Sequence, residues 1–380
     1  MDKLSHYGIR GNLHNLFSSY LSNRKQFVRV NNVNSDLKDI TCGVPQGSVL
    51  GPLLFLLYMN DLANCCPEVF FRIFADDTGI FFHCKDITTL SSLAEKIIQN
   101  ISRWFECNKL TLNASKTSYV IFRSSRYQNK NLPNTLQCNN IIINRECQAK
   151  YLGVTLDEYL NYNEYVEDLC KKLKRLFPVF YNIRNYLDKD HIKTIYFTML
   201  YSRLKYGCIT YGLTSLENMN KIQVIQNKLL KVLLKKPFRY STSKLHNDLE
   251  LLKFEDIVNQ EITVFVFDFL KGNLPCVFEG YYEHRLTEED FLEEVTRFRL
   301  KIPPYRTNIG ENTVKVQGVK LFNKYVNQID LNLNTKTFKK RIKNIILPYP
   351  TELNFQISVF FPTFCVHSKI IIYKLAICSF

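Results

Sequence analysis

The chain has 380 residues, with 50 lysines and arginines against 35 acidic residues and a formal net charge of +15. This excess favours a partner with a phosphate backbone, although an anionic membrane surface would also attract it. The twelve cysteines form no C-x-x-C pair and no Cys/His cluster at zinc spacing, which excludes a zinc knuckle and indicates reduced thiols in an intracellular protein, nuclear or cytoplasmic. Residues 1–20 are polar and predict no signal peptide, and residues 370–377 are too short to span a bilayer, so no membrane partner is expected.

The first informative segment runs from Gly43 to Leu62. Its string Pro45-Gln46-Gly47-Ser48 favours a turn in which the backbone passes close to a ligand. Pro52 then suits the first turn of a helix that is apolar nearly all round, which predicts a helix buried behind a site. A buried helix entered by a tight loop is the alternative, but it does not explain the Pro-Gln-Gly-Ser string.

The second segment places two adjacent carboxylates at the tip of a predicted β-hairpin. Strand formers at 69–74 and 80–82 flank Asp76 and Asp77, and Asp76 to Gly79 supplies the turn. Carboxylate oxygens are ligands that Mg²⁺ prefers, and two-metal phosphoryl transfer needs them clustered. Taken alone, an Asp-Asp-Thr-Gly loop is more often a solvated turn.

Two weaker signals follow. Apolar residues at helical spacing predict a helix over 90–105, and Lys116 comes shortly after it. Residues 128–140 are rich in asparagine and predict a loop. Tyr151-Leu152-Gly153-Val154 indicates a short strand with a glycine at a close approach of the backbone.

Three basic amphipathic helices are predicted next. The first, around 166–180, is kinked or ended by Pro178, the second runs over 188–206 behind a cap at Asp188, and the third runs over 220–235. Each basic face is a candidate nucleic-acid surface, and equally the solvated face of an ordinary bundle.

In this order, the segments 43–62, 74–78, 112–117 and 151–154 resemble the successive palm motifs of the reverse transcriptases of non-LTR retrotransposons, the Jockey-like and related elements of animal genomes. The resemblance continues to about Leu347. It implies an α+β fold, with a partial polymerase palm (an antiparallel sheet with helices) followed by a helical thumb and a helical C-terminal region. The implied boundaries are 1–157 for the palm, 158–237 for the thumb, 238–347 for the post-polymerase region and 348–380 for an unmatched tail.

The resemblance also implies the site. Asp76 and Asp77 would be catalytic and hold Mg²⁺, for which Mn²⁺ could substitute, while Lys116 would offset charge on the departing pyrophosphate. The residues expected to contact the template and the nucleotide are Pro45, Gln46, Gly47, Ser48, Phe74 and Ala75. The residues expected to support the primer end are Tyr151, Leu152 and Gly153. The implied partners are an RNA template, a DNA primer and deoxynucleotide triphosphates, and no partner protein is indicated.

One departure from the family bears on activity. The family's first catalytic motif, a strand ending in Phe-Asp, has no counterpart, and Met1–Gly11 resembles the helix that follows it, so we expect an N-terminally truncated polymerase domain without fingers. Asp2 and Asp61 are not placed to replace the missing acid. Two of three expected carboxylates should bind a metal pair poorly, so we expect a polymerase fragment that is inactive or nearly so. The alternative is a non-enzymatic remnant that binds RNA or RNA–DNA hybrid.

Overall fold

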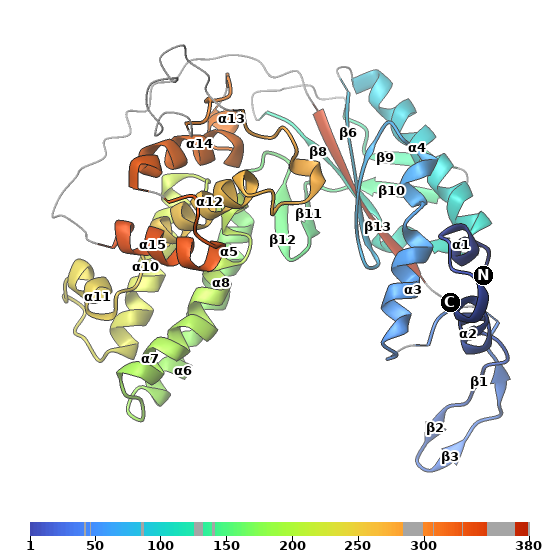
Figure 1. Ribbon diagram of the computed structural model, residues 1–380, viewed down its shortest axis with the longest axis horizontal. Coiled ribbons are helices and arrows are strands. Elements are labelled where there is room, and N and C mark those ends of the chain that lie inside the picture. The colour runs from blue at the N-terminus through green and yellow to red at the C-terminus, as the bar shows by residue number, and fades with distance from the viewer. Residues whose placement is uncertain are drawn as a thin grey trace. The chain divides into compact units, whose positions relative to one another are not determined.

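The computed structural model describes all residues except 42, 46, 85–86, 125–131, 139–140, 284–298, 307, 329, 348–368 and 379–380. It contains two compact units, Met1–Leu160 with His367–Phe380, and Asn161–Val366. The first combines a sheet with helices and the described part of the second is helical (Figure 1), so the chain has the mixed helix-and-sheet structure that the sequence predicts. Among the described residues, no helix is long and apolar enough to cross a membrane.

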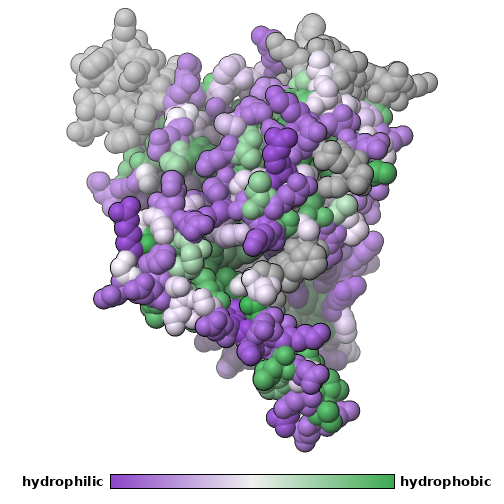
Figure 2. All heavy atoms as spheres, turned by 90° about the vertical axis from the view of Figure 1, so that its right-hand side faces the viewer, coloured by the Kyte–Doolittle hydropathy of each residue, from purple (hydrophilic) through white to green (hydrophobic). Residues whose placement is uncertain are grey.

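The first unit opens with short elements outside the main sheet. They are α1 (Asp2–His6), α2 (Gly11–Leu21), the ribbon of β1 (Lys25–Gln26) with β4 (Lys38–Asp39), the ribbon of β2 (Arg29–Val30) with β3 (Val33–Asn34), and α3 (Leu50–Met59). Apolar side chains of the ribbon region lie on the surface, at the lower end of Figure 2, with Val28 64 % and Val33 71 % exposed. The ribbons therefore add little to the core.

Helix α3 departs from its prediction in one respect. Pro52 lies in its first turn as expected, but Leu53 and Leu56 are 50 % and 49 % exposed, whereas Leu54 and Met59 are buried. The expectation of a helix buried nearly all round is therefore wrong for the described structure. Apolar composition indicated burial, but only one side of α3 finds packing partners, among them Leu4 and Phe17.

The main sheet has its last strand in the middle. Its order is β5 (Phe70–Phe74), β6 (Asp77–Cys84), β13 (Lys369–Cys378), β8 (Ser118–Phe122), β10 (Ile141–Arg145) and β9 (Thr135–Cys138), and β7 (Thr111–Leu112) also pairs with β13. Among the described strand pairs of this sheet, the β8–β10 pair is the only parallel one. The sequence indicated an unmatched tail and gave no sign that part of it forms this central strand, red in Figure 1.

Helix α4 (Ile87–Cys107) supplies much of the core of this unit. Its buried side chains recur at helical spacing, as predicted, and pack with buried residues of the sheet such as Ile80 and Tyr119. The same core holds Leu62 from the 3₁₀ turn η1 (Leu62–Cys65). The remaining elements are η2 (Ala114–Lys116) and the hairpin of β11 (Gln148–Tyr151) with β12 (Val154–Asp157).

The second unit is a helical bundle. Its elements are α5 (Asn163–Lys174), α6 (Leu176–Ile183), α7 (Lys189–Ile195), the π-helical segment η3 (Tyr196–Tyr201), α8 (Ser202–Lys205), α9 (Cys208–Tyr211), α10 (Leu216–Leu233), α11 (Thr242–Leu249), α12 (Phe254–Leu270), η4 (Cys276–Phe278), α13 (Asn308–Glu311), α14 (Val314–Tyr325), η7 (Val326–Gln328) and α15 (Thr335–Ile346). The predicted break occurs between α5 and α6, three residues before Pro178. Asp188 caps α7 as predicted, accepting hydrogen bonds from the amides of Asp190 and His191.

Helix α10 is tied to its neighbours by buried polar side chains. Gln226 donates from Nε2 to the hydroxyl of Tyr196 and to the carbonyl of Leu252, both at 3.0 Å. Asn227 Oδ1 lies 2.8 Å from Nε2 of His246 on α11. These residues belong to a segment that the family resemblance covers, and in the structure they connect three parts of the bundle.

The buried His246 makes the stability of this unit dependent on pH. Burial lowers the pKa of its fully buried imidazole from 6.5 to about 4, despite a hydrogen bond with the carbonyl of Leu251. Between about pH 6.5 and 4, His246 therefore binds a proton in the unfolded chain but stays neutral in the folded unit. The free energy of unfolding is undiminished above about pH 6.5, and we expect it to fall by about 2 kcal/mol between pH 6.5 and 5.

Urea unfolding at a series of pH values measures this loss. His246→Gln keeps a polar side chain that does not titrate, so its stability should vary less over the same range, whatever its absolute stability. If the free energy of unfolding of the variant falls with pH as steeply as that of the parent, groups other than His246 cause the pH dependence.

Candidate nucleotidyl-transfer site

Asp76 and Asp77 lie at the tip of the β5–β6 hairpin, whose turn begins one residue earlier than predicted. Phe74 pairs with Asp77, so Ala75 and Asp76 form a two-residue turn, and Asp77 to Gly79 belong to β6 rather than to the turn. Ala75 has φ = 52°, a conformation that residues with a Cβ seldom adopt. The sequence offered Gly79 as the turn glycine, and that assignment is wrong.

The environments of the two acids differ. Asp76 is exposed on the turn, whereas Asp77 is half-buried at the start of β6. The register sets Asp77 beside Phe74 on β5 and beside Ala376 on β13, so neither adjacent strand has a carboxylate at the paired position. Phe74 is 63 % exposed and lies with Ala75 at the hairpin end.

Asp76 and Asp77 offer too few ligands for a pair of metal ions. Aspartate oxygens suit Mg²⁺, but a pair of ions needs more ligands than two neighbouring carboxylates offer. Within the described part of the chain, no group of three or more His, Cys, Asp or Glu side chains could hold a metal ion. The described residues therefore do not fit a two-metal centre by themselves.

The predicted primer-supporting segment lies against the acidic hairpin. Leu152 and Gly153 form the turn between β11 and β12, both with positive φ, as two-residue hairpin turns of type I′ require. This turn follows Tyr151, whose hydroxyl donates to the carbonyl of Arg72 on β5 at 3.2 Å. The structure thus brings Tyr151 together with the strands that carry Asp76 and Asp77.

Gly79 explains how Tyr151 comes so close. A Cβ at residue 79 would lie 3.1 Å from the Tyr151 ring and 3.0 Å from the Phe81 ring. Those two rings meet edge to face with centroids 6.2 Å apart. Burial raises the pKa of the Tyr151 phenol, and the nearby Asp77 carboxylate adds to the rise. Gly79 therefore serves a close approach of two hairpins, not a turn.

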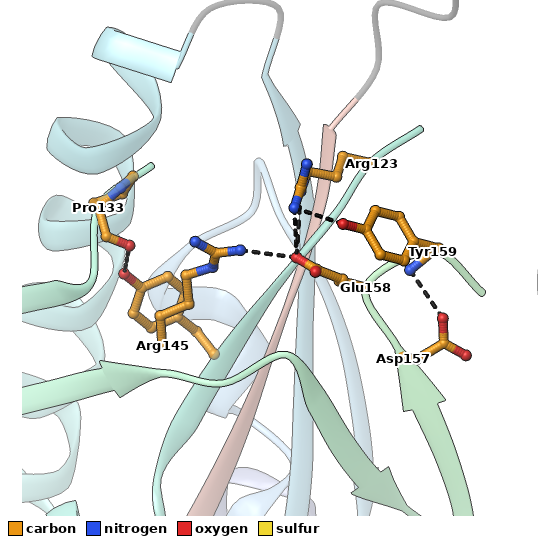
Figure 3. A network of polar contacts seen from close by, with 7 residues as sticks. Arg123, Pro133, Arg145, Asp157, Glu158 and Tyr159 are labelled. Carbon is orange, nitrogen blue, oxygen red and sulfur yellow. Dashed lines mark hydrogen bonds and ion pairs between the residues drawn. The ribbon is translucent and has the colours of Figure 1, made fainter. Parts of the chain in front are cut away.

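A buried ionic cluster holds the other end of the β11–β12 hairpin (Figure 3). Oε2 of Glu158 accepts from Nη2 of Arg123 at 3.1 Å and from Nη2 of Arg145 at 2.8 Å. Arg123 also donates to the hydroxyl of Tyr159 at 2.8 Å. Arg123 follows β8 and Arg145 ends β10, so one carboxylate fastens the residue after β12 to two points of the main sheet.

The Pro45–Ser48 segment leads into α3. The Ser48 hydroxyl donates to the carbonyl of Pro45 at 2.8 Å and accepts from the amide of Gly51 at 2.9 Å, so it connects the loop to the first turn of α3. Gly47 has φ = 80° and is exposed, and Gln46 lies outside the described residues. Ser48 thus has a structural role in addition to the predicted contact with the template.

Lys116 is exposed at the end of η2, two residues before β8. The preceding turn is held by Asn113, whose Oδ1 accepts from the Ser115 hydroxyl and whose carbonyl accepts from the Thr117 hydroxyl, both at 2.7 Å. These bonds fix the backbone on either side of Lys116 while its ammonium group faces solvent. Contact with pyrophosphate stays a prediction.

Sequence reasoning missed Gly79 as a contact residue and missed Glu158 altogether. A glutamate after a short strand carries no local signal, because its partners come from β8 and β10. Gly79 was noticed, but turn statistics favoured the more common use of glycine.

Comparison with known proteins agrees with the motif order. Residues 2–156 match the family model described as reverse transcriptase (RNA-dependent DNA polymerase). Over this region the chain is similar to reverse transcriptases. No solved structure is significantly similar to it.

The similar proteins are encoded by transposable elements, in agreement with the predicted resemblance. The chain is 30 % identical over 254 residues to the probable RNA-directed DNA polymerase from transposon X-element of Drosophila melanogaster, covering 64 % of this chain and 27 % of the relative. It is 29 % identical over 259 residues to the RNA-directed DNA polymerase from mobile element jockey of the same species, with the same coverage. It is 27 % identical over 200 residues to a Pol polyprotein from type-1 retrotransposable element R1 of Bradysia coprophila, covering 52 % of this chain and 19 % of the relative. The matches thus span about a quarter or less of each relative's length.

Proposed function

We propose that the chain carries part of an RNA-directed DNA polymerase, which adds deoxynucleotides to the 3′-hydroxyl of a DNA primer on an RNA template. The main support for this proposal is that Tyr151 packs against the β5–β6 hairpin, which presents Asp76 and Asp77. Two segments far apart in the sequence, assigned to the primer end and to the metal ligands, thereby meet in one place. On this proposal, the first unit is a palm, and the helices that begin at α5 form a thumb.

Each group of site residues has its own proposed role. Asp76 and Asp77 would act as ligands for divalent ions such as Mg²⁺, which reverse transcriptases use. Lys116 would stabilise charge on the departing pyrophosphate, and the Pro45–Ser48 segment would contact template and nucleotide. The Tyr151–Gly153 turn would support the primer end.

The small number of metal-ligating side chains favours a second candidate function. Since the described residues do not complete a two-metal centre, the isolated chain would bind RNA or RNA–DNA hybrid without extending a primer. Binding depends on cationic side chains rather than on the carboxylates, so it should survive where catalysis does not.

Primer extension on an RNA template, with Mg²⁺ and with Mn²⁺, tests both candidates. We expect no extension, or barely detectable extension, and hybrid binding that Asp76→Asn does not weaken. Asp39→Asn is a matched control, because Asp39 is an exposed acid that lies 3.7 Å from Lys25. Robust extension that Asp76→Asn abolishes and Asp39→Asn leaves intact would show an active polymerase and contradict the second candidate. Failure to bind hybrid at low salt would contradict both.

A further inference from the structure

Among the described long helices of the second unit, α15 is the most one-sided in charge. Its twelve residues, Thr335–Ile346, include five cations and no acid: Lys336, Lys339, Lys340, Arg341 and Lys343. The helices singled out from the sequence are less cationic. Helix α5 carries three acids besides its three lysines, and Lys172 pairs with Asp168 at 2.6 Å, while in α10 Lys221 pairs with Glu217 at 2.7 Å.

The apolar side of α15 is used within the bundle. Phe338 is fully buried and stacks on Phe267 of α12, with centroids 3.8 Å apart and planes 13° apart. Gln260 of α12 donates to the carbonyl of Lys339 at 2.8 Å, and the Lys339 ammonium forms an ion pair with Glu261. Asn334 caps the first turn by accepting from the amide of Thr337. The helix is therefore held in one orientation by packing, a cap and an ion pair.

The outward side of α15 is uniformly polar. Lys336, Lys340 and Arg341 are exposed, as are the neighbouring Thr337 and Asn344. Within the described part of the chain, none of the three cations forms an ion pair with an acid. Three unneutralised charges on adjacent turns of a fixed helix make a strip of positive potential.

We propose that this outward face of α15, defined by Lys336, Lys340 and Arg341, binds the phosphate backbone of a nucleic-acid strand. The choice of nucleic acid rests on the proposed function, whereas the surface itself is defined by the geometry of the bundle. A membrane-binding helix needs an exposed apolar side to insert, and that side of α15 is buried against α12. A protein interface needs an apolar centre, which the outward face lacks. Phosphate contacts need neither, because their free energy comes largely from released counterions.

The salt dependence of binding measures how many phosphates the face contacts. The triple variant Lys336→Gln, Lys340→Gln, Arg341→Gln removes three charges from exposed positions. We expect the slope of log K against log salt to become shallower by about 2 on single-stranded RNA and by somewhat more on RNA–DNA hybrid. Affinity near 0.1 M salt should fall by about 10- to 100-fold.

Helix α5 supplies the matched control. The triple variant Lys171→Gln, Lys172→Gln, Lys174→Gln removes the same number of charges from a helix that also carries three acids, and should change the slope by less than 1. The pair Lys336→Arg, Lys340→Arg keeps the charges and should restore binding of the full chain to that of the parent. Circular dichroism and thermal unfolding establish that each variant is folded.

The outcomes separate the alternatives. Equal losses in the α15 and α5 variants, or no loss in the α15 variant, would overturn the assignment, as would a parent chain that binds no nucleic acid. Binding by the parent to vesicles of anionic lipid that depends on the same three residues, without a loss of RNA affinity in the variant, would assign the face to a membrane instead. Primer extension is measured separately, so loss of polymerase activity and loss of this surface are distinguishable.

Discussion

Replacing Glu158 with alanine is expected to lower the free energy of unfolding of the first unit by about 3–5 kcal/mol, because it leaves two largely buried guanidinium groups without their counter-charge. The side chain of Glu158 is 11 % exposed, and those of Arg123 and Arg145 are each 14 % exposed. Water can therefore do little to replace the lost carboxylate. Urea unfolding followed by a signal from the first unit measures the effect.

Two controls show whether charge is the cause. Glu158→Gln keeps the shape and one acceptor, so it should lose less stability than the alanine variant but still weaken both contacts. Asp39→Ala breaks an exposed pair, in which Lys25 and Asp39 are 59 % and 74 % exposed, and should cost less than about 1 kcal/mol. A cost for Glu158→Ala no larger than that for Asp39→Ala would mean that the cluster is not buried as the structure describes.

The cluster also connects stability to the proposed site. Glu158 immediately follows β12, and Tyr151 lies at the other end of the β11–β12 hairpin. Loss of the anchor should therefore raise hydrogen exchange at the amides of this hairpin before it affects α4. A uniform rise across the first unit would instead indicate that Glu158 supports the whole fold and not the placement of Tyr151.

What the sequence predicted well depends on patterns within one segment. The apolar spacing of α4, the cap at Asp188 and the strands around Asp76 and Asp77 are each specified by neighbouring residues, and each is found in the structure. The motif order predicted similarity to reverse transcriptases because it sums several such local signals, none of which is decisive alone.

The errors concern features that depend on distant segments. Leu53 and Leu56 have the composition of a core but lack packing partners, and composition cannot show which side of a helix is covered. Gly79 has its role because Tyr151 lies against it from another hairpin. The place of β13 within the sheet depends on its pairing with β6 and β8, which lie far earlier in the chain, and no local pattern encodes such pairing.

The central position of β13 leads to the largest expected effect of any truncation. A chain ending at Val366 is expected to lose the cooperative unfolding of the first unit, because β6 and β8 have no direct pairing in the described sheet and are joined only through β13. Lys369–Ala376 pairs with Asp77–Cys84 on one side, and Ile370–Lys374 pairs with Ser118–Phe122 on the other. At about 1 kcal/mol of net stability per hydrogen bond, removal of both ladders would approach the whole stability of a domain, about 5–15 kcal/mol.

Addition of a synthetic peptide of residues 367–380 distinguishes this pairing from a general effect of shortening the chain. The peptide should bind the truncated chain with one-to-one stoichiometry and restore a cooperative transition. A peptide with Ile372→Pro should not, because residue 372 pairs with both Phe81 and Val120 and proline has no N–H to donate. If the truncated chain unfolds with the midpoint and slope of the full chain, β13 contributes nothing to the sheet. The β5–β6 hairpin would then be held by its packing with α4 and by the contact of Tyr151 with Arg72.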